Sequence, residues 1–160
     1  MRDELLSIIE KNSKIGLNEL AVLLGADEAA VLSEIESLER EGVICGYHTL
    51  IDWEKTSIEK VTGLIEVRVT PQRGQGFDSV AERIYNYPEV RATYLISGGY
   101  DLLVILEEKS LREISNFVTY KLSTLDSVLS TATHFILKKY KDHGTILAQK
   151  HEDEREIITP

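Results

Sequence analysis

The chain of 160 residues is predicted to fold as an α+β protein, helical in its first third and mixed beyond it. Two observations lead to this prediction. Apolar residues recur at helical spacing up to residue 42, whereas from residue 61 onward alternating stretches are interleaved with helical ones. Hydrophobic residues make up 42% of the chain and charged residues 28%, which is typical of a globular protein and not of a disordered one.

Residues 1–52 are predicted to form three helices and a short β wing. The apolar stripes of the helices are Leu5, Ile8 and Ile9, then Leu17, Leu20, Ala21 and Leu24, then Val31, Ile35 and Leu38. Gly25 stops the second helix, and Asp27 is suited to cap the third, which ends at Gly42. Val43–Ile51 is short and apolar, as a wing would be. This order indicates a winged helix-turn-helix, although many small three-helix domains share the pattern.

Residues 53–60 are polar and aperiodic, so a linker is predicted there. Residues 61–141 then show the order β-α-β-β-α-β, which is the ferredoxin-like arrangement. Gly98 and Gly99 are expected to form a two-residue hairpin turn before a central strand. Residues 142–160 are expected to be a C-terminal tail, with a solvated charge run from His151 to Glu156 and a possible edge strand at Ile157–Ile158. The expected elements are strands at 61–70, 90–96, 100–106 and 128–138, and helices at 77–84 and 111–125.

Both helices of the second domain are expected to cover the same face of its sheet. The opposite face is predicted to carry four apolar side chains, Leu64, Leu95, Leu103 and Ile105. No other element of the chain is left to cover them, and sheets bury their apolar faces. The sequence therefore predicts a homodimer formed through this face.

The chain is acidic, and its charge is unevenly distributed. The net charge is −9, of which −7 lies in residues 1–60. This acidity argues against indiscriminate nucleic-acid binding, because phosphate contacts require Lys and Arg. A single cysteine, Cys45, excludes an internal disulfide, and we find neither a secretory signal nor an apolar run of membrane-spanning length. These features predict a cytoplasmic protein without membrane contact.

The sequence gives little support for an enzyme, a metal site or a cofactor. No Gly-rich phosphate loop, nucleophile elbow or paired-carboxylate pattern is present. The four histidines lack metal-ligand spacing, and one cysteine cannot build a thiolate site. The histidines are His48, His134, His143 and His151.

The helix-turn-helix, wing, linker and β-α-β-β-α-β domain, in this order, resemble the Lrp/AsnC family of feast/famine regulators. The resemblance covers about residues 1–147. Its motifs are Leu20-Ala21, Leu24-Gly25, Val31, Ile35 to Glu39, Glu41 to Tyr47 leading to Asp52, Ser97 to Asp101, and Thr133 to Lys141. It implies a transcriptional regulator that binds double-stranded DNA and forms dimers, tetramers or octamers.

The resemblance also implies a small effector, commonly an amino acid, at a subunit interface near Gly98–Asp101. Asp101 can accept an amine, although Gly98-Gly99 is also explained by a hairpin turn alone. The candidate effector-binding residues are Ser97, Gly98, Gly99, Tyr100 and Asp101 on one wall, and Thr131, Thr133 and His134 on the other. The candidate DNA-binding residues are Lys11, Lys14, Asn18, Ala29, Ala30, Ser33, Ser37 and Arg40.

The third helix departs from the family pattern, because its expected solvent face carries carboxylates and only one base. That face is expected to comprise Ala29, Ala30, Ser33, Glu34, Ser37 and Glu41, with Arg40 as the only base. Glu34 and Glu36 would be repelled by phosphates, and Arg40 would attract them. Two further interpretations stay open. One is an effector-binding oligomer whose degenerate helix-turn-helix acts through a partner regulator. The other is an enzyme that decarboxylates a tetrapyrrole, for which the sequence lacks a basic, His-lined pocket.

Overall fold

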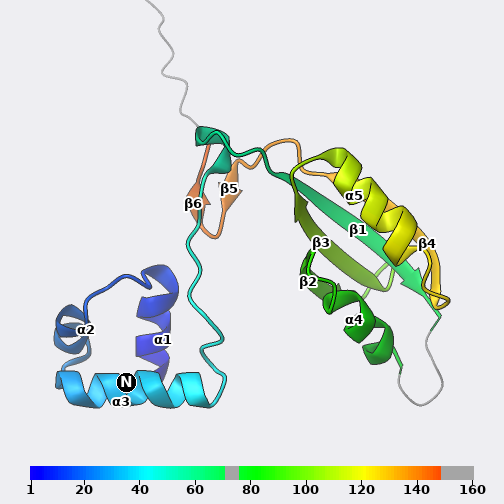
Figure 1. Cartoon of the computed structure of the whole chain (residues 1–160). Helices are drawn as coiled ribbons and strands as arrows, with labels where there is room; N and C mark the ends of the chain where they lie inside the picture. Colours follow the sequence, from blue (N-terminus) through cyan, green and yellow to red (C-terminus); the bar gives the residue numbers. More distant parts are fainter. Residues whose placement is uncertain (71–75, 149–160) are drawn as a thin grey trace, which may run out of the picture. The chain divides into compact units, whose positions relative to one another are not determined.

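The computed structural model describes residues 1–70 and 76–148 (Figure 1). The chain divides into two compact units between Leu50 and Ile51, and each is described by itself. Within the described ranges, no helix is long and apolar enough to cross a membrane.

The first unit consists of α1 (Arg2–Lys11), α2 (Leu17–Leu24) and α3 (Glu28–Arg40), which confirms the three predicted helices. Gly25 has φ 61°, the left-handed conformation that ends a helix readily only at glycine. The side chain of Asp27 accepts a hydrogen bond from the backbone N–H of Ala30 at 2.9 Å, so it caps α3 as predicted. The core of this unit comprises Leu5, Leu20, Ala21, Val31 and Leu38.

The predicted wing at residues 43–51 is wrong, because the structure forms no strand there. The backbone N–H groups of Val43 and Ile44 instead donate to the carbonyl of Leu38, at 2.9 and 3.1 Å, and close the end of α3. A β ladder requires a second strand, and the described part of the first unit offers none to residues 45–51.

The second unit contains a four-stranded antiparallel sheet with strand order β2-β3-β1-β4. The predicted order β-α-β-β-α-β is observed, and β3 is central as expected. The helix α5 continues into a π-helical turn, η2. The bounds are β1 (Val61–Val69), α4 (Asp78–Tyr85), β2 (Val90–Leu95), β3 (Leu102–Glu108), α5 (Leu111–Phe117), η2 (Val118–Leu122) and β4 (Val128–Phe135).

Helices α4 and α5 share one core with the sheet, so both cover the same face, as predicted (Figure 1). This core includes the side chains of Ile65 and Val67 of β1, Val104 of β3, Ile84 of α4 and Ile114 of α5. Alternation along the strands sends the intervening side chains to the opposite face, here called the open face. The open face carries Ala92 and Tyr94 of β2, Leu64, Glu66 and Arg68 of β1, Leu103 and Ile105 of β3, and Ala132 and His134 of β4.

The prediction that Leu95 lies on the open face is wrong. Leu95 pairs with the buried Leu102, so the two side chains lie on the helix-covered face. Leu95 is exposed there because it is the last residue of the edge strand β2. Tyr94, its neighbour in the sequence, pairs with Leu103 and takes its place on the open face.

The glycine pair between β2 and β3 does not form the predicted two-residue turn. The backbone N–H of Ile96 donates to the carbonyl of Asp101, so residues 97–100 form a wider loop. Neither Gly98 nor Gly99 has the positive φ that a primed two-residue turn requires.

A two-residue turn occurs instead within the predicted tail. His143 and Gly144, with φ of 43° and 78°, connect β5 (Lys141–Asp142) to β6 (Thr145–Ile146). The start of the predicted tail is therefore folded. In the predicted linker, Trp53–Lys55 forms a short 3-10 helix, η1. The predicted charge run and the edge strand at residues 151–158 lie outside the described residues.

Candidate functional site

One stripe on the outward side of α3 is electrically balanced, although Glu28 and Glu39 of the same helix are also exposed. A stripe of four exposed side chains runs along it at positions i, i+4, i+7 and i+11, which share one helix face. These are Ala29, Ser33, Glu36 and Arg40. The stripe therefore carries one carboxylate and one guanidinium, and its net charge is zero.

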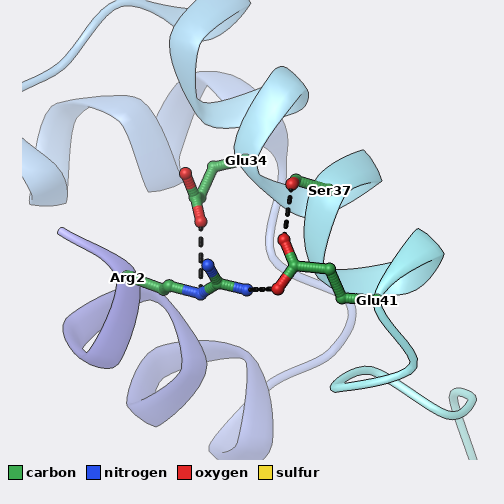
Figure 2. Close-up of polar contacts among 4 residues, drawn as sticks. All are labelled: Arg2, Glu34, Ser37 and Glu41. Atoms are coloured by element: carbon green, nitrogen blue, oxygen red, sulfur yellow. Dashed lines mark hydrogen bonds and ion pairs between the residues drawn. The ribbon is translucent and has the colours of Figure 1, made fainter.

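Two carboxylates expected on this outward side lie on its flank instead. Glu34 and Glu41 are seven residues apart, about two helical turns, so they share a face. Figure 2 shows the Arg2 guanidinium of α1 between them. Arg2 Nε lies 3.5 Å from Glu34 Oε1, and Arg2 Nη2 donates a hydrogen bond to Glu41 Oε2.

Ser37 completes this group, which we call the Arg2 cluster (Arg2, Glu34, Ser37 and Glu41). The Ser37 hydroxyl donates to Glu41 Oε1 at 2.8 Å, so Ser37 is turned along the flank and is half-buried (Figure 2). The hydrogen bonds from Arg2 and Ser37 hold the pKa of Glu41 below its ordinary value. Glu41 therefore stays ionised at neutral pH, and the contact weakens only as the pH falls through that lowered pKa.

A third carboxylate of α3 is also engaged. Glu39 Oε1 accepts a hydrogen bond from the Tyr47 hydroxyl at 2.8 Å. Desolvation and this hydrogen bond to Glu39 raise the pKa of Tyr47, so the phenol remains a donor at neutral pH.

The other predicted DNA-binding residues are mostly exposed. Lys11 ends α1, Lys14 follows it, and Asn18 lies in the first turn of α2. In the described part of the chain, neither lysine nor Arg40 takes part in an ion pair. Ala30 is half-buried, and its backbone N–H is occupied by the Asp27 cap.

The β2–β3 loop is fastened to β1 through Asp101. Its carboxylate Oδ2 accepts the backbone N–H of Val69 at 2.9 Å, and its own N–H donates to the carbonyl of Val67 at 3.0 Å. Ser97, Gly98 and Gly99 are exposed at the tip, whereas Tyr100 is half-buried. Asp101 therefore has a structural role, and its second carboxylate oxygen, Oδ1, accepts no hydrogen bond among the described residues.

The two predicted walls of the effector site do not face each other within one chain. The strand β1 separates the β2–β3 loop from Thr131, which pairs with Val67, so roughly 10 Å lies between them. Thr131 and Thr133 belong to the helix-covered face, whereas His134 is on the open face. There, His134 Nε2 lies 3.3 Å from Glu66 Oε1. Neither a cleft of about 90 Å³ beside Trp53 nor one of about 310 Å³ beside Tyr47 is lined by any of the eight predicted residues.

Reasoning from the sequence missed Arg2 and Glu66. The seven-residue spacing of Glu34 and Glu41 was the available signal for Arg2, because it indicates a common partner on a neighbouring helix. Within residues 1–70 and 76–148, no group of three or more His, Cys, Asp or Glu side chains is placed to hold a metal ion.

Comparison with known proteins identifies the family. A profile described as the Lrp/AsnC ligand binding domain matches residues 62–146. The HTH-type transcriptional regulator YugG of Bacillus subtilis is 48% identical over 158 residues, which cover 98% of this chain and 95% of YugG. The regulator LrpA of Pyrococcus abyssi is 28% identical over 141 residues, 88% of this chain and 97% of LrpA.

Solved structures share the fold. Escherichia coli AsnC aligns with a TM-score of 0.66 at 19% identity, over 86% of this chain and 91% of AsnC. The Neisseria meningitidis regulator NMB0573, solved in complex with L-Met, aligns with a TM-score of 0.70 at 20% identity, over 88% of this chain and 90% of NMB0573. The chain is therefore a member of the Lrp/AsnC family of transcriptional regulators.

Proposed function

We propose that this regulator binds double-stranded DNA through its first unit as an oligomer and that an amino acid bound to the second unit modulates the affinity. The observation that carries the proposal is the outward stripe of α3, whose net charge is zero, together with Lys11, Lys14 and Arg40, which take part in no ion pair within the described residues. We further propose that α2 and α3 act as a helix-turn-helix and that the second unit is ferredoxin-like.

In this proposal, α3 enters the major groove, and Ala29, Ser33 and Arg40 face the bases. Arginine makes the commonest specific contact with guanine. The phosphate backbone of the DNA is contacted by Lys11, Lys14 and Asn18, as it is by the loop and first turn before a recognition helix in such domains. Ala30 and Ser37 flank the stripe.

Three free cations per unit predict a modest salt dependence. At about 0.9 per phosphate contact, a dimer using all six gives a slope of log K against log [salt] of about −5. The probe is a DNA duplex from the region upstream of the gene that encodes this protein, called the upstream duplex. We expect fluorescence anisotropy to show this slope and a higher affinity for the upstream duplex than for a shuffled duplex. Equal affinity for both duplexes, or no binding at low salt by an intact oligomer, would contradict the proposal and favour a degenerate helix-turn-helix.

We also propose that the effector site is completed by a neighbouring subunit. The β2–β3 loop (Ser97–Asp101) offers an exposed tip and the free oxygen of Asp101, which can accept the amine of an amino acid. Because β1 separates this loop from Thr131, Thr133 and His134 in one chain, the opposite wall comes from another copy. The methionine complex of NMB0573 supports an amino acid as the ligand class.

Two substitutions at Asp101 separate its structural role from ligand binding. Asp101→Ala leaves the N–H of the buried Val69 without its partner, so we expect a loss of about 1–3 kcal/mol in the free energy of unfolding. Asp101→Asn can keep that hydrogen bond but loses the charge. We expect thermal-shift measurements with each standard L-amino acid to find a stabilising ligand for the wild type. The Asn variant should fold normally and lose that response; a response equal to wild type would place the amine elsewhere.

A further inference from the structure

We infer that Arg2 is a positioning residue for DNA binding: its guanidinium holds the carboxylates of Glu34 and Glu41 on the flank of α3 and offsets their charge. This inference rests on the proposed DNA-binding function. It concerns an arginine at the very start of the chain, in the first turn of α1, outside the turn and the third helix.

The geometry shows one cation shared by two carboxylates. Arg2 contacts Glu34 through Nε and Glu41 through Nη2, so two different nitrogens of the planar guanidinium are used (Figure 2). A lysine, with a single nitrogen on a flexible stem, cannot reproduce this fork. The hydrogen bond from Ser37 fixes the second oxygen of Glu41, so the carboxylate is oriented from both sides.

Glu34 depends on Arg2 most directly. Among the described residues, its buried Oε1 accepts no hydrogen bond, and Arg2 Nε is the cation that lies within 4 Å of it. Without that guanidinium, the carboxylate would lose its compensating charge, and the side chain would gain by swinging outward into water.

The direction of that swing matters for DNA. Around α3, the face of Glu34 and Glu41 borders the face of Ala30 and Ser37, next to the outward stripe. Loss of the Arg2 charge would change the net charge of these three side chains from −1 to −2 beside the surface that meets phosphates, and α3 has only Arg40 to oppose it. Arg2 thus makes an acidic helix compatible with a polyanion, without touching the DNA itself.

A double-mutant cycle tests this role, with the full chain and the upstream duplex as the probe. The variants are Arg2→Gln, the pair Glu34→Gln and Glu41→Gln, and all three together. In the wild-type background we expect Arg2→Gln to weaken binding about three- to tenfold at low salt, and less at high salt because the charges are screened. In the background that carries Glu34→Gln and Glu41→Gln, Arg2→Gln should lower the affinity for DNA at most about twofold, because no carboxylate remains to be restrained.

Three outcomes are informative. An equal loss in both backgrounds would show that Arg2 contacts DNA directly, and no loss in either would show that it has no part in binding; both overturn the inference. If the wild type itself fails to bind, the proposed function fails instead. Glu10→Gln, which removes an exposed carboxylate outside the cluster, sets the size of a general charge effect.

Folding of the first unit is checked by amide hydrogen exchange in α1 and α3. If Arg2→Gln loses protection there, the same cycle is read with Arg2→Lys, which keeps the charge and loses the fork. We expect Arg2→Lys to bind with an intermediate affinity in the wild-type background and like its parent when both glutamines are present. A lysine variant equal to the wild type would contradict the need for the fork.

Discussion

Replacing Leu38 with Ala is expected to unfold the first unit while leaving the second intact. Leu38 is fully buried in a core of only five buried side chains. Leucine-to-alanine changes at such sites cost about 2–5 kcal/mol, and a unit of this size has little stability to lose. Amide exchange in residues 2–40 should become fast, and binding to the upstream duplex should disappear.

The second unit serves as the internal reference for this experiment. Its core is separate from that of the first unit, so exchange in β1 and β3 should stay slow and the oligomer should persist. Leu32→Ala, on the same helix but 45% exposed, is the matched control and should change stability by less than about 0.5 kcal/mol. Loss of the oligomer in Leu38→Ala would contradict the independence of the two cores.

Replacing Ile105 with Asp is expected to convert the protein into monomers. Ile105 lies on β3 at the centre of the open face, paired with Leu64 on one side and Ala92 on the other. A twofold axis would bury the new carboxylate twice, and an unpaired buried charge costs several kcal/mol. We therefore expect a loss of affinity between subunits of about a thousandfold or more.

Light scattering coupled to size exclusion measures this change, because one chain has a mass of 18.1 kDa. Tyr120→Asp is the matched control: it adds the same charge at a side chain that is 72% exposed on η2, in the helix layer. Its mass should equal that of the wild type. A wild-type monomer, or an Ile105→Asp variant that remains a dimer, would refute association through the open face.

Local signals in the sequence were sufficient for most elements. Gly25 and Asp27 mark the turn between α2 and α3 because Gly25, which lacks a Cβ, adopts the left-handed conformation, and the side chain of Asp27 caps α3. Alternation located the strands, but it did not place Leu95, since a shift of one residue moves a side chain to the other face. The prediction of a wing at residues 43–51 was wrong for a related reason, because an apolar segment forms a strand only where a partner strand exists.

The candidate sites were harder to predict, because they depend on contacts between distant residues. The acidity of α3 could be read from its sequence, but its pairing with Arg2 bridges 39 positions between Arg2 and Glu41. Asp101 was recognised as a ligand candidate, whereas its hydrogen bond to Val69 depends on how the loop meets β1. The separation of Asp101 from Thr131 by β1 follows from the strand order of the whole sheet and from no motif at either residue.

The regulator is proposed to couple the binding of DNA to the binding of an amino acid. The direct test is the affinity of the wild-type oligomer for its upstream duplex, measured by anisotropy with and without the amino acid that stabilises it thermally. We predict a change in affinity of at least about fivefold, and binding of the amino acid must change by the same factor when DNA is present. Equal DNA affinities with and without saturating amino acid would contradict this coupling.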